Sequence, residues 1–375
     1  MNNTKNIILL SIIFISIMTA DIASPTPFNV RQPNGLELII QNRGNHLQGW
    51  REHEGWTVLK DNQGWWVYAL RNNGQGLVPS SLKVGIDEPI QGNSQIQKGI
   101  RPEPHILIDN APIPDLNATR TDTFRVPLIL VEFPDAYAIY EPSEIDSIMN
   151  QEGYTHLGYD NTGSFRDFYQ EISYGAFLPI AEVSNWFMAP NEHDYYSYNN
   201  GYTRVRQLVR TMVDELEESG FDWSEYDNDN DGYVDALNLI HQGAGAEEGD
   251  YSNIWSHKSS LGNLAVNYDG VTINSYNISP EIQNGNIVAI GVLAHEFGHA
   301  LGLPDLYDTD YTSSGAGKLA LMASGSWGTS NNSPWYPATM VGWCKNELGW
   351  VEVVEITDDQ DMVSIQQTYS NDTIY

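Results

Sequence analysis

The stretch AHEFGHALGLPDLYD, which begins at Ala294, constrains this chain more than any other. Apolar residues recur before and within it at three- and four-residue steps, which predicts a helix over residues 287–301. His295 and His299 are four positions apart, so their imidazoles share one face of that helix and can reach the same zinc ion. Glu296 would lie slightly aside, where it can act as a base toward a water molecule. This is the H-E-x-x-H arrangement.

The residues after the helix predict a third ligand. Gly302 readily adopts the left-handed conformation that ends a helix, and Pro304 prevents the helix from resuming. The chain must turn back there, so Asp305 can place a carboxylate oxygen on the same metal. Three protein ligands and a water molecule are typical of a catalytic zinc site. The alternative is an ordinary helix with two hydrogen-bonded histidines, and Asp308 is an alternative ligand or a capping carboxylate.

The N-terminus is typical of a secretory signal peptide. Lys5 precedes the apolar run IILLSIIFISIM, and small residues follow at Ala20 and Ala23. We expect residues 1–23 to be the signal peptide, with cleavage after Ala20 or Ala23. The run is shorter than the roughly 20 apolar residues that a membrane-spanning helix needs, which disfavours the alternative of an uncleaved anchor. The expected location is extracellular, without a stable membrane anchor.

The charge balance excludes some partners. The chain carries 49 acidic and 18 basic residues, a formal net charge of −31, which argues against nucleic acid and anionic membranes and suits the binding of cations. Cys344 is the single cysteine, so an intramolecular disulfide is impossible. We expect Cys344 to be a small buried side chain, and bound metal ions to stabilise the fold in place of disulfides.

The composition changes along the chain and predicts two units. Residues 24–119 contain short strand-like runs between turn residues and end in a Pro-rich linker over residues 102–114. Residues 120–354 mix a buried strand near 124–133 with amphipathic helices near 164–172 and 203–219, of which the second ends at a glycine. Residues 355–375 read as the start of a C-terminal β region and suggest a truncated product or fragment.

The acidic run DNDNDGYVD predicts a calcium loop. Carboxylates at its first, third, fifth and ninth positions, a glycine at the sixth and a backbone carbonyl at the seventh match such a loop; the expected ligands are Asp227, Asp229, Asp231, Tyr233 and Asp235. A full EF-hand has glutamate at position twelve, where this chain has Asn238, so a helix–loop–strand site is expected. The alternative is a solvated turn, which the mutual repulsion of four aspartates disfavours.

Several motifs together resemble one family. HEFGHALGLPDLYDTD, LMASGSWG, KNELGWVE, RVPLILVEFPD, FYQEISYGAF and IWSHKS occur in an order similar to that of the immune inhibitor A-like secreted bacterial zinc metalloproteases. The resemblance covers residues 120–355, and the N-terminal unit resembles the pro-region of such enzymes. It implies an α+β, metzincin-like catalytic domain with a mixed sheet and an active-site helix. It also implies the H-x-x-G-x-x-D variant, with Asp305 in place of a third histidine, and a methionine turn at Met322.

These observations predict a secreted, zinc-dependent endopeptidase that cleaves extracellular proteins or peptides and is made as a precursor. Pro-region cleavage is expected near Arg120, with Arg101 and Arg125 as alternatives. The absence of a cysteine before Cys344 excludes a thiol latency switch, so an inhibitory pro-region must use another ligand or occlusion. The competing hypothesis is a calcium-stabilised extracellular binding or adhesion protein with an inactive protease-like domain.

Three further residues are given no firm role. His241 and His257 are expected to be structural, although His257 could contact substrate. Tyr336 could stabilise an oxyanion, but its spacing does not establish this.

Overall fold

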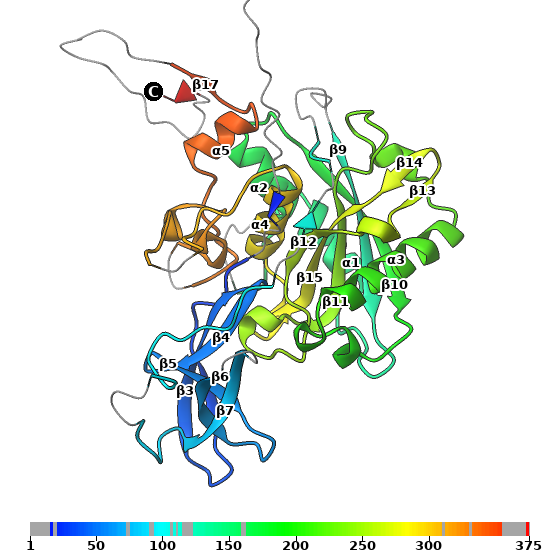
Figure 1. Ribbon diagram of the computed structural model, residues 1–375. Coiled ribbons are helices and arrows are strands. Elements are labelled where there is room, and N and C mark those ends of the chain that lie inside the picture. Colours follow the sequence, from blue (N-terminus) through cyan, green and yellow to red (C-terminus); the bar gives the residue numbers. More distant parts are fainter. Residues whose placement is uncertain are drawn as a thin grey trace, which may run out of the picture.

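The computed structural model describes most of the chain and both units (Figure 1). The described residues are 16–17, 21–72, 76–89, 94–105, 108–109, 112–114, 123–158, 163–309, 312–329, 332–354 and 373–374. Nearly all of the expected signal peptide and of the expected C-terminal β region lies outside them. Within the described part of the chain, no helix is long and apolar enough to cross a membrane.

The N-terminal unit is an antiparallel meander, drawn in blue and cyan in Figure 1. Its strands pair in sequence order: β2 (Phe28–Arg31), β3 (Glu37–Asn45), β4 (Gln48–His53), β5 (Trp56–Lys60), β6 (Trp66–Asn72) and β7 (Gly76–Lys83). Alternate residues of β3 are buried, because successive side chains of a strand point to opposite faces. Leu38 and Ile40 thereby share a small core with Val58 and Trp66.

The second unit is built on a mixed sheet. Its order is β10 (Pro179–Met188), β9 (Phe124–Glu132), β11 (Leu237–Ala244), β15 (Ser275–Gln283) and β12 (His257–Ser260), and β16 (Asn286–Ile287) extends β15 as a hairpin. The first four strands are parallel, and β12 is the antiparallel edge strand. Both faces of β9 are buried: Leu128 and Leu130 belong to one core, and Ile129 and Val131 belong to another.

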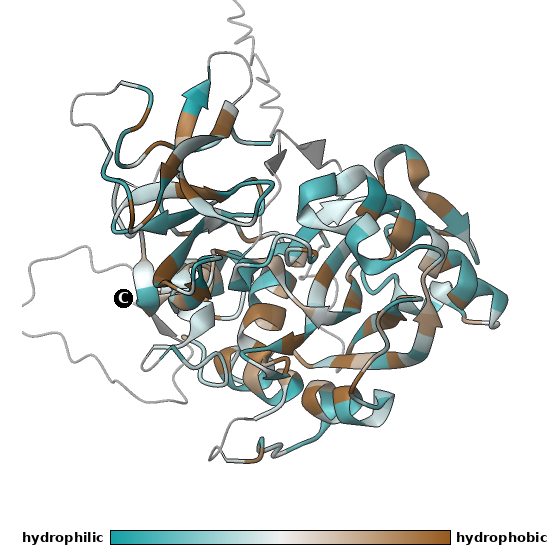
Figure 2. Ribbon diagram, turned by 90° about the horizontal axis from the view of Figure 1, so that it is seen from below, coloured by the Kyte–Doolittle hydropathy of each residue, from teal (hydrophilic) through white to brown (hydrophobic). Residues whose placement is uncertain are grey.

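Helices cover both faces of this sheet. The first core joins the sheet to α1 (Pro142–Asn150), α2 (Phe165–Ile172) and α4 (Ile290–Ala300), and α3 (Tyr202–Glu218) closes the second core. Helices in Figure 2 carry both apolar and polar residues. Only part of α1, α2 and α3 is buried, as expected of amphipathic helices, whereas every residue of α4 is buried. Among the described residues, the remaining regular elements are β1 (Ser16–Ile17), β8 (Ile108–Asp109), β13 (Val266–Tyr268), β14 (Val271–Ile273), α5 (Gly342–Glu347), β17 (Glu352–Val353), β18 (Thr373–Ile374) and seven short 3-10 helices.

Most expected elements of the second unit are present, and Cys344 is buried. The helix predicted over residues 287–301 begins three residues later, at Ile290. The reason is a competing partner, because Ile287 pairs with Ile282 of β15 and the Val288 N–H donates to the Glu281 carbonyl oxygen. Apolar residues just before a helix satisfy the helical spacing equally well when they belong to a hairpin.

Candidate metal centre

Two imidazole nitrogens converge on α4. His295 and His299 are buried, and their Nε2 atoms are 3.0 Å apart. The Nδ1 atom of His295 is 2.8 Å from the Leu321 carbonyl oxygen, and that of His299 is 2.7 Å from the Leu303 carbonyl oxygen. A carbonyl oxygen only accepts, so Nδ1 carries the hydrogen in both rings, and Nε2 is the nitrogen of each ring that can bind a metal once it is deprotonated.

The turn after α4 brings Asp305 close to the two histidines. Gly302 has φ +92°, the left-handed conformation expected of it, and the Leu303 N–H donates to the Gly298 carbonyl oxygen. Asp305 Oδ1 comes within 3.2 Å of His295 Nε2 and 3.3 Å of His299 Nε2. The structure therefore brings His295, His299 and Asp305 together, as the spacing predicts.

The donor set fits a zinc ion. Two neutral imidazoles and one carboxylate are ligands that zinc prefers, and three protein ligands leave a position for water. Asp305 Oδ1 is buried without a hydrogen bond, whereas Oδ2 accepts a hydrogen bond from the Tyr307 hydroxyl at 2.9 Å. Burial alone would raise the pKa of Asp305, but the facing His299 and His295 rings hold it below its usual range. A carboxylate that stays ionised beside two imidazole rings is chemically suited to a cation.

Glu296 lies beside this group and is fully buried, which raises its pKa well above the usual range. Its Oε2 atom has no hydrogen-bond partner among the described residues, and its Oε1 accepts the Asp21 N–H at 2.7 Å. Asp21 directly follows Ala20, one of the two expected cleavage points. The base predicted from the sequence is therefore held by a backbone group 275 positions away.

Asp21, Ile22 and Ser24 are hydrogen-bonded to the second unit. Ser326 Oγ donates to Asp21 Oδ1 at 2.8 Å, and Trp255 and Trp327 donate their indole N–H groups to the carbonyl oxygens of Asp21 and Ile22. Sequence reasoning missed these contacts. The motifs that contain Trp255, Ser326 and Trp327 were visible, but no local spacing relates them to the N-terminus.

Met322 lies directly under α4. A Cβ atom added at Gly298 would be 2.5 Å from Met322 Sδ, so the glycine lets this side chain approach the helix between the two histidines. The Met322 carbonyl oxygen also accepts the Leu306 N–H, which links this turn to the loop that carries Asp305.

The residues that were given no firm role have identifiable surroundings. Asp308 Oδ2 accepts hydrogen bonds from the Ser313 N–H and from the hydroxyls of Thr312 and Ser313, so it caps the next loop. His241 and His257 are both buried, and burial lowers the pKa of His257 to about 4. Tyr336 is 38% exposed.

The N-terminal unit brings a histidine to this neighbourhood. His46 is buried, stacks on His257 with a centroid separation of 5.8 Å, and accepts a hydrogen bond from the Tyr202 hydroxyl on its backbone carbonyl. The neighbouring Asn45 donates its side-chain N–H to the Tyr307 hydroxyl at 2.8 Å. The meander therefore contacts the group that supports Asp305.

The acidic run forms a compact loop between a 3-10 helix (Trp223–Tyr226) and β11. Oxygens of Asp227, Asp229 and Asp231 lie within 4.8 Å of one another. Asp235 is buried and its Oδ2 accepts the Asn228 N–H at 2.6 Å, and Tyr233 is half-exposed. Gly232 has φ +91°, which permits the sharp turn.

More than half of this chain is similar to a known peptidase family. Residues 113–351 match the family described as immune inhibitor A peptidase M6, catalytic domain. The pre-pro-metalloprotease PrtV of Vibrio cholerae serotype O1 is 30% identical over 319 residues, which is 68% of this chain and 34% of PrtV. Immune inhibitor A of Bacillus thuringiensis subsp. alesti is 30% identical over 239 residues, 52% of this chain and 34% of that protein. This chain thus spans about a third of the length of these relatives.

Proposed function

Because this chain belongs to the immune inhibitor A peptidase M6 family, we propose that it is a secreted zinc-dependent endopeptidase with a metzincin-like catalytic domain. The observation that carries the proposal is the convergence of His295 Nε2, His299 Nε2 and Asp305 Oδ1 beside the buried carboxyl of Glu296. Its substrates are extracellular proteins or peptides.

The protein groups would divide the work as follows. His295, His299 and Asp305 hold the zinc, which when bound supplies a Lewis acid that activates water and polarises the scissile carbonyl. Glu296 takes the proton of the attacking water on its carboxylate and passes it to the nitrogen of the leaving amine. Burial of Glu296 favours the protonated form that this second step needs. Met322 supports the histidines from below.

The test is the substitution Glu296→Gln, which keeps the size of the side chain and removes the base. We expect casein cleavage to fall by about 10²- to 10⁴-fold, the usual contribution of a general base, while zinc content stays at one ion per chain. The exposed residue Glu218 on α3 offers a matched control, because Glu218→Gln makes the same chemical change away from the centre. Casein cleavage at the parental rate by Glu296→Gln would refute the mechanism.

We also propose that the chain is made as a precursor that the N-terminal unit keeps inactive. This rests on the Asp21 N–H, which occupies Glu296 Oε1, and on the burial of Asp21 between Trp255 and Ser326. Signal-peptide cleavage after Ala20, rather than after Ala23, would leave these contacts intact. The inhibition would then act by occlusion, in agreement with the absence of a pro-region cysteine.

N-terminal sequencing of the active secreted form tests the precursor. We expect its first residue to lie between positions 101 and 126, with cleavage near Arg120. Arg125 is a less accessible site, because it lies in β9 and its N–H donates to Asn228 Oδ1. A fully active protein that begins at Asp21 or Ser24 would contradict the proposal.

The acidic loop is proposed to bind calcium in a structural role, through Asp227, Asp229, Asp231, the Tyr233 carbonyl oxygen and Asp235. The close approach of three carboxylates on a loop with a positive-φ glycine supports this.

A further inference from the structure

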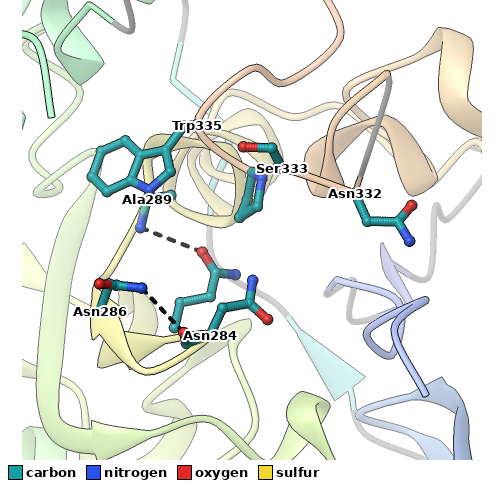
Figure 3. A pocket seen from close by; sticks show the side chains of 8 residues that line it. Asn284, Asn286, Ala289, Asn332, Ser333 and Trp335 are labelled. Atoms are coloured by element: carbon teal, nitrogen blue, oxygen red, sulfur yellow. Dashed lines mark hydrogen bonds between the residues drawn. The ribbon is translucent and has the colours of Figure 1, made fainter. Parts of the chain in front are cut away.

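A polar pocket lies at the N-terminal end of α4 (Figure 3). Its walls are two segments: residues 283–289, which connect β15 to α4, and residues 332–335, which follow Met322 in the chain. Its volume is about 190 Å³, enough to hold several water molecules. Asn284 and Asn286 are exposed, so the pocket opens to solvent on the side of the hairpin.

The pocket contains buried polar atoms without partners. Gln283 is 3% exposed, and its Oε1 accepts the Ala289 N–H at 3.3 Å. An N–H can only donate, so the oxygen must face Ala289, and the side-chain nitrogen faces elsewhere. That Nε2 atom and Ser333 Oγ both lack a hydrogen-bond partner among the described residues. A buried donor without an acceptor is unfavourable, so the pocket is complementary to a group that brings an acceptor oxygen.

The lining also selects against charge. It consists of amides, a hydroxyl, Ala289, Pro334 and the indole of Trp335. A charged ligand would lose hydrating water molecules in the pocket without gaining an ion pair. A neutral carboxamide would replace its hydrogen bonds to water by hydrogen bonds to Gln283 and Ser333. The indole does not offer a free face for stacking a sugar, because Trp335 is 4% exposed and stacks on His156 at 4.1 Å.

The wall of the pocket contacts α4, the helix that carries His295 and His299. The Gly291 N–H of α4 donates to the Pro334 carbonyl oxygen, and a Cβ atom at Gly291 would be 2.0 Å from the Ser326 carbonyl oxygen. Ala289 precedes His295 by six residues, about 9 Å along a helix that rises 1.5 Å per residue. An extended peptide covers about 3.3–3.6 Å per residue. A side chain two or three residues from the scissile bond could therefore span the distance between His295 and Ala289.

We propose that this pocket is a specificity subsite that accepts a neutral amide side chain, glutamine or asparagine, of the protein substrate. The proposal rests on the endopeptidase function proposed above. Gln283 donates to the side-chain carbonyl of the substrate, Ser333 forms the second contact, and the exposed Asn284 and Asn286 lie at the entrance.

The test compares cleavage sites in a library of peptides, using the secreted chain in its active form and its Gln283→Glu variant. This variant keeps the oxygen that accepts the Ala289 N–H and replaces the free donor by a carboxylate oxygen. For the parent, we expect about tenfold faster cleavage of peptides with glutamine than with methionine at one position within three residues of the scissile bond. For Gln283→Glu, the preference should move to lysine or arginine at that position.

Two further variants serve as controls. Ser333→Ala keeps the packing and should reduce the glutamine preference without creating a basic one. Gln207→Glu makes the same charge change on the exposed face of α3 and should keep the parental profile. Efficient cleavage without a preference at any position, or identical profiles for the parent and Gln283→Glu, overturns the subsite and leaves a water-filled pocket only. Absence of any cleavage by the parent would instead overturn the endopeptidase function itself, and the subsite with it.

Discussion

Calcium removal should lower the melting temperature of this protein through one loop. Oxygens of Asp227, Asp229 and Asp231 lie within 4.8 Å of one another. Two unit charges at that distance repel by about 0.9 kcal/mol in water, so the three pairs together oppose the folded loop by about 3 kcal/mol. Backbone N–H groups of Asp231 and Gly232 offset part of this, because they donate to Asp227 and Asp229. A bound cation removes the remainder.

The linkage between calcium binding and folding gives a stabilisation of similar magnitude. Calcium at a hundredfold excess over its Kd stabilises a folded state that alone binds it by about 2.7 kcal/mol. For a unit of roughly 150–250 residues, each 1 kcal/mol shifts the melting temperature by about 2–4 °C. The expected increase with calcium is therefore about 5–11 °C.

The assay is thermal unfolding of the Glu296→Gln variant with and without calcium, at constant zinc, because this variant cannot digest itself. The same comparison with Asp229→Ala and Asp231→Ala added should show almost no calcium effect. If calcium does not move the melting temperature, or moves it equally in both proteins, the loop is a solvated turn and the reasoning is wrong.

Three more results are expected. Loss of a residue that only supports a metal ligand typically lowers metal affinity by about 10- to 100-fold, and Asp305→Ala should weaken zinc binding by more than that. Asp308→Ala should retain zinc. The metal content after dialysis distinguishes the two variants. Gly291→Ala should lower the melting temperature despite better helix propensity, because its Cβ would meet the Ser326 carbonyl oxygen at 2.0 Å and overpacking costs about 1–3 kcal/mol. Burial raises the pKa of Glu247 to about 7, so the folded protein binds this proton more tightly than the unfolded chain does. The free energy of unfolding should therefore fall as the pH rises from about 4.5 to 7. Glu247→Gln should flatten this part of the dependence of stability on pH.

The convergence of His295, His299 and Asp305 was largely predictable because its determinants are local. The four-residue spacing of His295 and His299 fixes a shared helix face, and Gly302 with Pro304 forces the turn that returns Asp305 to them. A helix or a tight turn relates such residues by geometry alone. The start of α4 was less predictable, since the apolar residues before it serve a hairpin with β15.

The remaining features depend on contacts between distant segments. Gln283 and Ser333 form one pocket because residues 332–335 pack on the first turn of α4, and no periodicity in either segment indicates this. The same holds for His46, which reaches His257 across more than two hundred residues. Neither the pocket nor the interface between the units could be derived before the topology was known.

The N-terminal segment and a substrate would compete for the same donors. Trp255 precedes the edge strand β12 and Trp327 follows Met322, and their indoles donate to consecutive carbonyl oxygens of Asp21 and Ile22. A peptide chain held between a sheet edge and an opposing wall is fixed mainly by such contacts to its backbone, which do not depend on its side chains. If the proposed occlusion is correct, the segment takes the place of a substrate backbone, and its Asp21 N–H already holds Glu296 Oε1. Side-chain selectivity would then depend on neighbouring pockets, of which the proposed amide subsite at the start of α4 is one.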